Sequence, residues 1–294
     1  LQIAERLGIP LTLGRGPEPL RLRRSNYARA PNQASVPGRV VLDGIELLRG
    51  AFVRLDSYAL DAVAREILGK GKTYAGADRP AEILRMFKED RTRFVEYNLN
   101  DAHLVLEILD ELHLVDLAVV RSRLTGMPPD RVAASIASFD FLYLSELSSR
   151  GVVAPTVQTS AYSETPTTGG HVLEPLPGLY RNVLVFDFKS LYPSIIRTFQ
   201  IDPLGYLPSP RAEDDPIVAP NGASFRRARG ILPQILDDLF PRRDQAKAAG
   251  DKVASHAIKI LMNSFYGVLG TPACRFASPA LANAITGFGR EILL

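Results

Sequence analysis

One acidic residue stands where a predicted buried strand gives way to a helix. Residues 183–186 (VLVF) are apolar and β-branched, which predicts a strand buried on both faces, and Asp187 follows at its end. Pro193 favours the first turn of a helix that carries Ile195 and Ile196. The turn between strand and helix places backbone N–H groups beside a carboxylate, and such a site can hold a divalent cation with the phosphates it bridges. This pattern points to phosphoryl-transfer chemistry.

A second chemically suggestive stretch is basic. Residues 226–259 contain eight arginines and lysines against four acids, so we expect this stretch to face an anion. Arg243 and Lys247 are four residues apart and therefore lie on one face of a helix. Pro241, two residues earlier, is expected to kink or split that helix.

A polar stripe follows on the next predicted helix. Lys259, Asn263, Tyr266 and Gly267 fall at positions i, i+4, i+7 and i+8. The opposite face is apolar and is expected to enter the core: Ile258, Leu261, Met262 and Phe265. Lysine and asparagine can meet phosphate, and a tyrosine beside a glycine offers a flat surface for a base pair.

An acid and a phenol share another predicted helix. Tyr97 and Asp101 are four residues apart, on the face that also carries Ile108, so both side chains should point inward. A capping or solvated aspartate is the alternative interpretation of this short pattern.

Residues 187–196 (DFKSLYPSII) closely resemble the first polymerase motif of family B DNA polymerases, and residues 259–267 (KILMNSFYG) resemble a second motif of that family. Two specific motifs in this order make a chance match a poor explanation. The runs 197–205 (RTFQIDPLG) and 267–276 (GVLGTPACRF) are most similar to the bacterial DNA polymerase II branch.

The resemblance implies template-directed DNA synthesis with two Mg²⁺ ions per active site. It implies that Asp187 is catalytic and holds metal, and that Tyr192 meets the sugar. The remaining nucleotide-binding residues that it implies are Ser190, Leu191, Arg243, Lys247, Lys259, Asn263, Tyr266 and Gly267.

Placed upstream of these motifs, Tyr97 and Asp101 are similar to the third motif of the family's 3′-5′ proofreading exonuclease, in which the aspartate holds a metal ion and the tyrosine orients water. The family's other exonuclease acids (DxE and a segment ending in FD) and the palm's DTD motif have no match here. With helix-like residues at both ends, we expect an internal fragment that is inactive by itself. The alternative is a polymerase-like DNA-binding module that has lost its chemistry.

The resemblance also implies the architecture, a mixed α/β chain. Residues 1–113 would be the C-terminal part of a ribonuclease H-like exonuclease domain, 114–180 a connector, 181–225 the first part of the palm, and 226–294 the fingers and the start of the return to the palm. Gly169 and Gly170 resemble the family's YxGG segment, which contacts template DNA, although Thr167 stands at the tyrosine position. A plain flexible turn is the alternative.

Composition is that of an ordinary globular protein. The 294 residues are 46% hydrophobic and 23% charged, with a net charge of +3. The lone cysteine, Cys274, excludes an internal disulfide and a cysteine-based zinc site, and fits a reducing cytoplasm. The expected partners are primer-template DNA and deoxynucleoside triphosphates, with a sliding clamp as a further candidate and no membrane.

Overall fold

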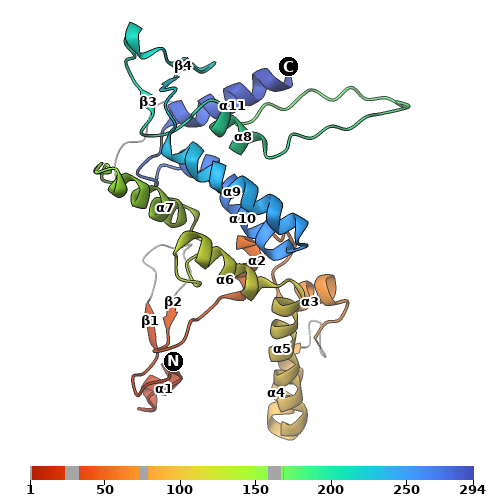
Figure 1. Cartoon of the computed structure of the whole chain (residues 1–294). Coiled ribbons are helices and arrows are strands. Elements are labelled where there is room, and N and C mark those ends of the chain that lie inside the picture. The colour runs from red at the N-terminus through yellow and green to blue at the C-terminus, as the bar shows by residue number, and fades with distance from the viewer. Residues whose placement is uncertain (1, 24–32, 73–78, 158–166, 168) are drawn as a thin grey trace. The chain divides into compact units, whose positions relative to one another are not determined.

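A computed structural model describes residues 2–23, 33–72, 79–157, 167 and 169–294 (Figure 1). The chain forms two compact units. The first comprises Leu1–Val119 and Pro128–Ala133, and the second comprises Val120–Met127 and Ala134–Leu294. Helices dominate both units and small sheets accompany them, so the mixed α/β class expected from the sequence is confirmed.

The first unit is built from helices and one antiparallel strand pair, in which Leu22 lies opposite Ala34. Its elements are α1 (Gln2–Arg6), β1 (Arg21–Arg23), β2 (Gln33–Ser35), α2 (Gly44–Gly50), α3 (Leu60–Leu68), α4 (Arg79–Glu89) and α5 (Arg91–Glu111). Helix α6 (Leu114–Thr125) belongs to this unit up to Val119 and to the second unit from Val120.

Local sequence determines where helix α3 ends and where helix α5 begins. Helix α3 ends at Gly69, whose φ of 68° is left-handed and suits glycine. Helix α5 begins after Asp90, whose side chain accepts a hydrogen bond from the Arg93 N–H. Along α5 the buried residues are Tyr97, Leu104 and Ile108, which share one face of the helix. Helices α3 and α5 pack together and fix this face.

The second unit surrounds an aromatic core. Phe139 stacks on Tyr143 with ring centroids 5.3 Å apart, and Phe265 and Phe276 meet Phe139 edge-on. The helices are α7 (Ser135–Ser149), α8 (Leu191–Thr198), α9 (Ile231–Ala248), α10 (Lys252–Leu269) and α11 (Pro279–Leu293). A small antiparallel sheet has the order β3 (Tyr206–Leu207), β5 (Ser224–Phe225), β4 (Ile217–Val218), with a 3₁₀ turn at Ala212–Asp214.

The strand predicted at residues 183–186 is wrong. This segment is extended but unpaired, and Figure 1 shows it within a long irregular loop that leads into α8. Val185 is 88% exposed and Phe186 is 87% exposed. A strand needs hydrogen-bonding neighbours, and none of the strands in the described ranges pairs with these residues. Asp187 therefore follows an exposed extended segment and precedes the turn into α8.

Pro241 does not split its helix, because α9 runs unbroken from Ile231 to Ala248. Proline inside a helix costs about 3 kcal/mol. Leu239 and Phe240, just before the proline, are buried, and α9 packs against both α8 and α10. We infer that this packing holds the helix continuous despite the proline.

A buried carboxylate joins the helices of the second unit. Asp202 is fully buried, and its Oδ1 accepts hydrogen bonds from the Tyr143 hydroxyl (2.9 Å) and the N–H groups of Leu204 (2.9 Å) and Gly205 (3.1 Å). Its Oδ2 accepts from the Leu232 N–H at 2.7 Å. Asp202 thereby links α7, the segment after α8 and the first turn of α9. Burial raises the pKa of this carboxyl.

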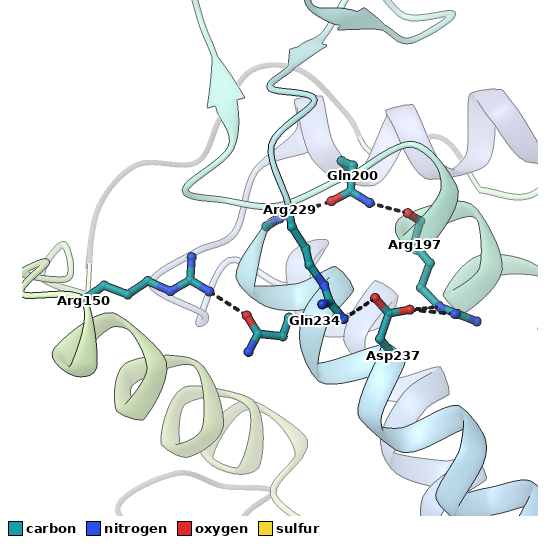
Figure 2. Close-up of polar contacts among 7 residues, drawn as sticks. Arg150, Arg197, Gln200, Arg229, Gln234 and Asp237 are labelled. Carbon is teal, nitrogen blue, oxygen red and sulfur yellow. Dashed lines mark hydrogen bonds and ion pairs between the residues drawn. The ribbon is translucent and has the colours of Figure 1, made fainter.

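A second network, closer to the surface, joins the same helices (Figure 2). Asp237 of α9 accepts from Arg197 of α8 at 2.6 Å and from Arg229 at 2.7 Å. Arg150, just after α7, donates to Gln234 of α9 at 2.8 Å. The two networks fix α8 against α9, and both helices carry residues of the predicted nucleotide site.

Candidate active site

A pocket of about 600 Å³ opens between the turn that precedes α8 and helices α9 and α10, all within the second unit. Its lining is Asp187, Phe188, Lys189, Ser190, Leu191, Tyr192, Pro193, Arg243, Lys247, Lys259, Asn263 and Tyr266. The lining thus contains Asp187 and every residue predicted to bind nucleotide except Gly267. Three segments that are up to 79 residues apart in sequence, from Asp187 to Tyr266, converge on one cavity.

The turn into α8 approaches α9 through two polar contacts. Ser190 is the N-cap residue of α8 and adopts a left-handed conformation, with φ 55° and ψ 59°. Its hydroxyl accepts a hydrogen bond from Arg243 Nη1 at 3.0 Å. Next to it, Lys189 Nζ lies 3.0 Å from both carboxylate oxygens of Asp244. The hydrogen bond from Lys189 lowers the pKa of Asp244, and the charges of Lys247 and Arg243 add to this effect.

The Arg243 guanidinium has one nitrogen in a hydrogen bond and another without a partner among the described residues. Nη1 binds Ser190, whereas Nε is buried and has no hydrogen-bond partner among the described residues. Because a buried N–H without an acceptor is costly, this atom is a place where a ligand oxygen would be favourable. Lys247, one turn later, also lines the pocket, as the spacing of four predicted.

Helix α10 divides into two faces as predicted. Ile258, Leu261, Met262 and Phe265 are buried. Lys259 and Asn263 are exposed and line the pocket, and Tyr266 joins them half-buried. Gly267 is exposed, and a Cβ there would have no described atom within 4 Å. Packing therefore does not explain a glycine at this position, and its predicted contact with a base pair stays a prediction.

Two tyrosines form one wall of the pocket. The rings of Tyr192 and Tyr266 lie 4.5 Å apart between centroids at an interplanar angle of 45°. Burial raises the pKa of Tyr266, with a further contribution from Tyr192. The Tyr266 phenol therefore presents a neutral, flat surface at neutral pH.

The electrostatic character of the pocket is positive. Its lining contains the cations Lys189, Arg243, Lys247 and Lys259 and, as carboxylate, Asp187. An open cavity of this size with converging cations and a flat aromatic wall suits a phosphorylated ligand with a planar group.

Of the adjacent glycines Gly169 and Gly170, the second lies close to Tyr192 in this wall. A Cβ on Gly170 would lie 2.7 Å from the Tyr192 hydroxyl oxygen, whereas a Cβ on Gly169 would have no described atom within 4 Å. The backbone thus comes close to a pocket side chain at Gly170 and not at Gly169. The predicted contact of the pair with template DNA stays a prediction.

In the first unit, α5 brings Tyr97 and Asp101 to a lysine that sequence reasoning missed. Asp101 Oδ2 forms an ion pair with Lys72 Nζ, and the Lys72 side chain is 9% exposed. Lys72 Nζ also lies 5.9 Å from the centre of the buried Tyr97 ring. Asp101 Oδ1 is buried with no hydrogen-bond partner among the described residues. Lys72 carries no spacing signal, because it lies 29 residues before Asp101 in an irregular segment.

The described ranges contain neither a cluster of metal-binding side chains nor a membrane-spanning helix. In those ranges no three histidines, cysteines, aspartates or glutamates gather in a way that could hold a metal ion. Nor is any described helix both long enough and apolar enough to cross a membrane.

Comparisons with known proteins agree with the motifs. The family model for DNA polymerase family B matches residues 133–294. DNA polymerase II of Escherichia coli (strain K12) is 43% identical over 294 residues, which cover 99% of this chain and 37% of that protein. The DNA polymerase delta catalytic subunit of Bos taurus is 30% identical over 92% of this chain and 26% of that protein.

A solved structure gives the same result. The family B DNA polymerase from the hyperthermophilic archaeon Pyrobaculum calidifontis has a TM-score of 0.78 and 28% sequence identity, with 99% of this chain and 39% of that chain covered. The chain spans less than two-fifths of the length of each of these relatives. The matched family model, the identity to relatives and the structural match agree that this chain belongs to DNA polymerase family B.

Proposed function

We propose that the second unit binds the incoming deoxynucleoside triphosphate of a DNA-directed DNA polymerase. The observation that carries the proposal is the convergence of Asp187, Tyr192 and three cations from α9 and α10 on one pocket. Primer-template DNA and deoxynucleoside triphosphates would be its substrates. A sliding clamp stays a prediction.

Each lining residue has a part in this proposal. Arg243, Lys247 and Lys259 would neutralise the triphosphate, and Asn263 would donate a hydrogen bond to it. The backbone N–H groups at Ser190 and Leu191, in the first turn of α8, would add further donors. Tyr192 would pack against the sugar and Tyr266 against the base pair.

The residues present fit a divalent cation once nucleotide is bound. Mg²⁺ is commonly held by one or two carboxylates together with substrate phosphates. Asp187 is exposed at the pocket and supplies one such carboxylate. Ions bound there would activate the primer 3′-hydroxyl and offset the charge of the leaving pyrophosphate. Because two ions require more carboxylates than Asp187 offers, we propose that the 294 residues bind nucleotide without polymerising it.

For the first unit we propose a part in 3′-5′ proofreading. The buried, unpartnered Oδ1 of Asp101 is an acceptor that a cation would satisfy, while Lys72 holds Oδ2. The neighbouring Tyr97 would orient the water that attacks the phosphodiester.

A non-catalytic DNA-binding module is the second candidate. It is favoured because the pocket lining offers Asp187 as its carboxylate, with cations and uncharged groups otherwise, whereas two-metal chemistry requires more carboxylates. Such a module would bind DNA equally well with and without nucleotide, whereas the polymerase proposal requires a nucleotide site.

Nucleotide binding by the 294-residue chain tests the proposal. Arg243→Ala should weaken Mg²⁺-dependent binding of dATP at least tenfold, since a charge-assisted contact contributes about 1.5 to 3 kcal/mol. Arg242→Ala is the matched control, because Arg242 precedes Arg243 on α9, is exposed and does not line the pocket. Equal effects of the two substitutions would mean that general positive charge, and not this pocket, binds the nucleotide.

A further inference from the structure

Gly170 lies at the hydroxyl end of Tyr192, and neither its backbone conformation nor burial explains a glycine there. Its φ lies outside the left-handed range, so an L-residue could adopt its backbone conformation. The residue is also exposed. The remaining constraint is space, because a Cβ would lie 2.7 Å from Tyr192 Oη, closer than real Cβ atoms approach other heavy atoms.

The contact is end-on to the phenol. Among the described residues other than the two chain neighbours of Gly170, Oη of Tyr192 is the one heavy atom within 4 Å of this Cβ position. Removal of the hydroxyl would therefore remove the whole obstruction. The neighbouring Gly169 differs, since its Cβ position has no described atom within 4 Å. The two glycines of the pair thus have different surroundings although they are adjacent.

The Tyr192 side chain is restrained by its packing against Tyr266 and by its place in a helix. Its ring packs against Tyr266 at 4.5 Å between centroids. Tyr192 is also in the first turn of α8, where the helix restricts its χ1 rotamers. A methyl group at position 170 would therefore turn the ring off its preferred rotamer or displace it within the pocket.

We propose that Gly170 is a positioning residue for Tyr192, and that the absence of its side chain sets how strictly the pocket distinguishes deoxyribose from ribose. This inference rests on the proposed function, in which Tyr192 meets the sugar of the nucleotide. Gly170 acts through Tyr192 and does not itself touch the nucleotide. The structure thus gives one glycine of the pair a part in sugar selection, separate from any contact with DNA.

The test is a double-mutant cycle on the 294-residue chain, with dATP and ATP as probes, Mg²⁺ present and DNA absent. Gly170→Ala should change the ratio of the dATP and ATP affinities about 2- to 10-fold toward ATP, the range expected for a side chain forced off its rotamer. Gly169→Ala adds the same methyl group to the same loop and should have a smaller effect. In a Tyr192→Phe background, Gly170→Ala should cause no further change in the ratio, because the obstructing atom is gone.

Each outcome separates the inference from the function on which it rests. Equal effects of Gly169→Ala and Gly170→Ala would overturn the inference, as would an undiminished Gly170→Ala effect in the Tyr192→Phe background. Failure of the unsubstituted chain to bind dATP at all would instead refute the proposed nucleotide site, and the inference with it, whereas equal affinities for dATP and ATP would overturn the inference alone. Circular dichroism of each variant at the temperature of the binding assay checks that a change in the ratio is not a loss of fold.

Discussion

Substitution of Asp202 by alanine should strongly destabilise the second unit. Three buried donors would lose their acceptor, namely the Tyr143 hydroxyl and the N–H groups of Gly205 and Leu232. The Leu204 N–H would keep Tyr143 Oη as an acceptor at 3.1 Å. Each buried donor without a partner costs about 1 to 3 kcal/mol, so the free energy of unfolding should fall by at least about 3 kcal/mol. Typical domains are stable by about 5 to 15 kcal/mol, so the loss would be a large share.

Asp202→Asn separates the hydrogen bonds from the charge. The side-chain oxygen can keep the three donors at Oδ1, while the amide NH₂ would meet the Leu232 N–H and lose that bond, at a cost of about 1 to 3 kcal/mol. The pKa of Asp202 is raised by burial, although hydrogen bonds from Leu232, Tyr143, Gly205 and Leu204 oppose this. A raised folded pKa means that the carboxyl contributes most to stability below the unfolded value of 3.8, and that this contribution is lost as pH rises through the folded pKa. The deficit of the asparagine variant should therefore be larger at acidic pH than at neutral pH.

Urea unfolding followed by circular dichroism, repeated across this pH range, measures both effects. Asp238→Ala is the control, since Asp238 is an exposed acid of α9 and should change stability by no more than about 0.5 kcal/mol. A loss below about 1 kcal/mol for Asp202→Ala would show that water satisfies the three donors. A deficit of Asp202→Asn that grows toward neutral pH would refute the stated direction of the pKa shift.

Three further predictions concern activity. In a complete polymerase that contains this sequence, Tyr192→Ala should admit ribonucleotides, and unchanged discrimination in primer extension would contradict the role of Tyr192 at the sugar. In the same protein, Asp101→Ala should abolish primer degradation while synthesis continues, and loss of both activities would instead identify Asp101 as a residue of the fold. The 294-residue chain by itself should not extend a primer at any Mg²⁺ concentration, because two ions need more than one carboxylate and Asp187 is the carboxylate that lines the pocket. Template-dependent extension would show that a second acid has been overlooked.

Much of the pocket could be predicted from the sequence, because its residues lie on helices whose side-chain directions follow from spacing. Helix periodicity places Arg243 and Lys247 on one face of α9. It likewise places Lys259 and Asn263 on one face of α10. The resemblance to a family then supplied what periodicity cannot, namely that these helices face the turn after Asp187.

The features that sequence reasoning missed depend on contacts between distant residues. Residues 183–186 have strand-forming side chains, but a strand also needs partners, and the sequence of the segment does not specify them. Lys72 reaches Asp101 because of how α3 and α5 pack, and the continuity of α9 through Pro241 likewise depends on its neighbours. Asp202 has a weak local signal, a turn-forming Asp-Pro pair, whereas its bonds to Tyr143 and Leu232 are tertiary.

A crystal structure of the 294-residue chain with a deoxynucleoside triphosphate and Mg²⁺ tests the central claim most directly. The account predicts the triphosphate between α9 and α10, within hydrogen-bonding distance of Arg243 and Lys259, with the sugar against Tyr192 and a cation between Asp187 and the phosphates. Nucleotide bound elsewhere on the chain, with this pocket empty, would contradict the account.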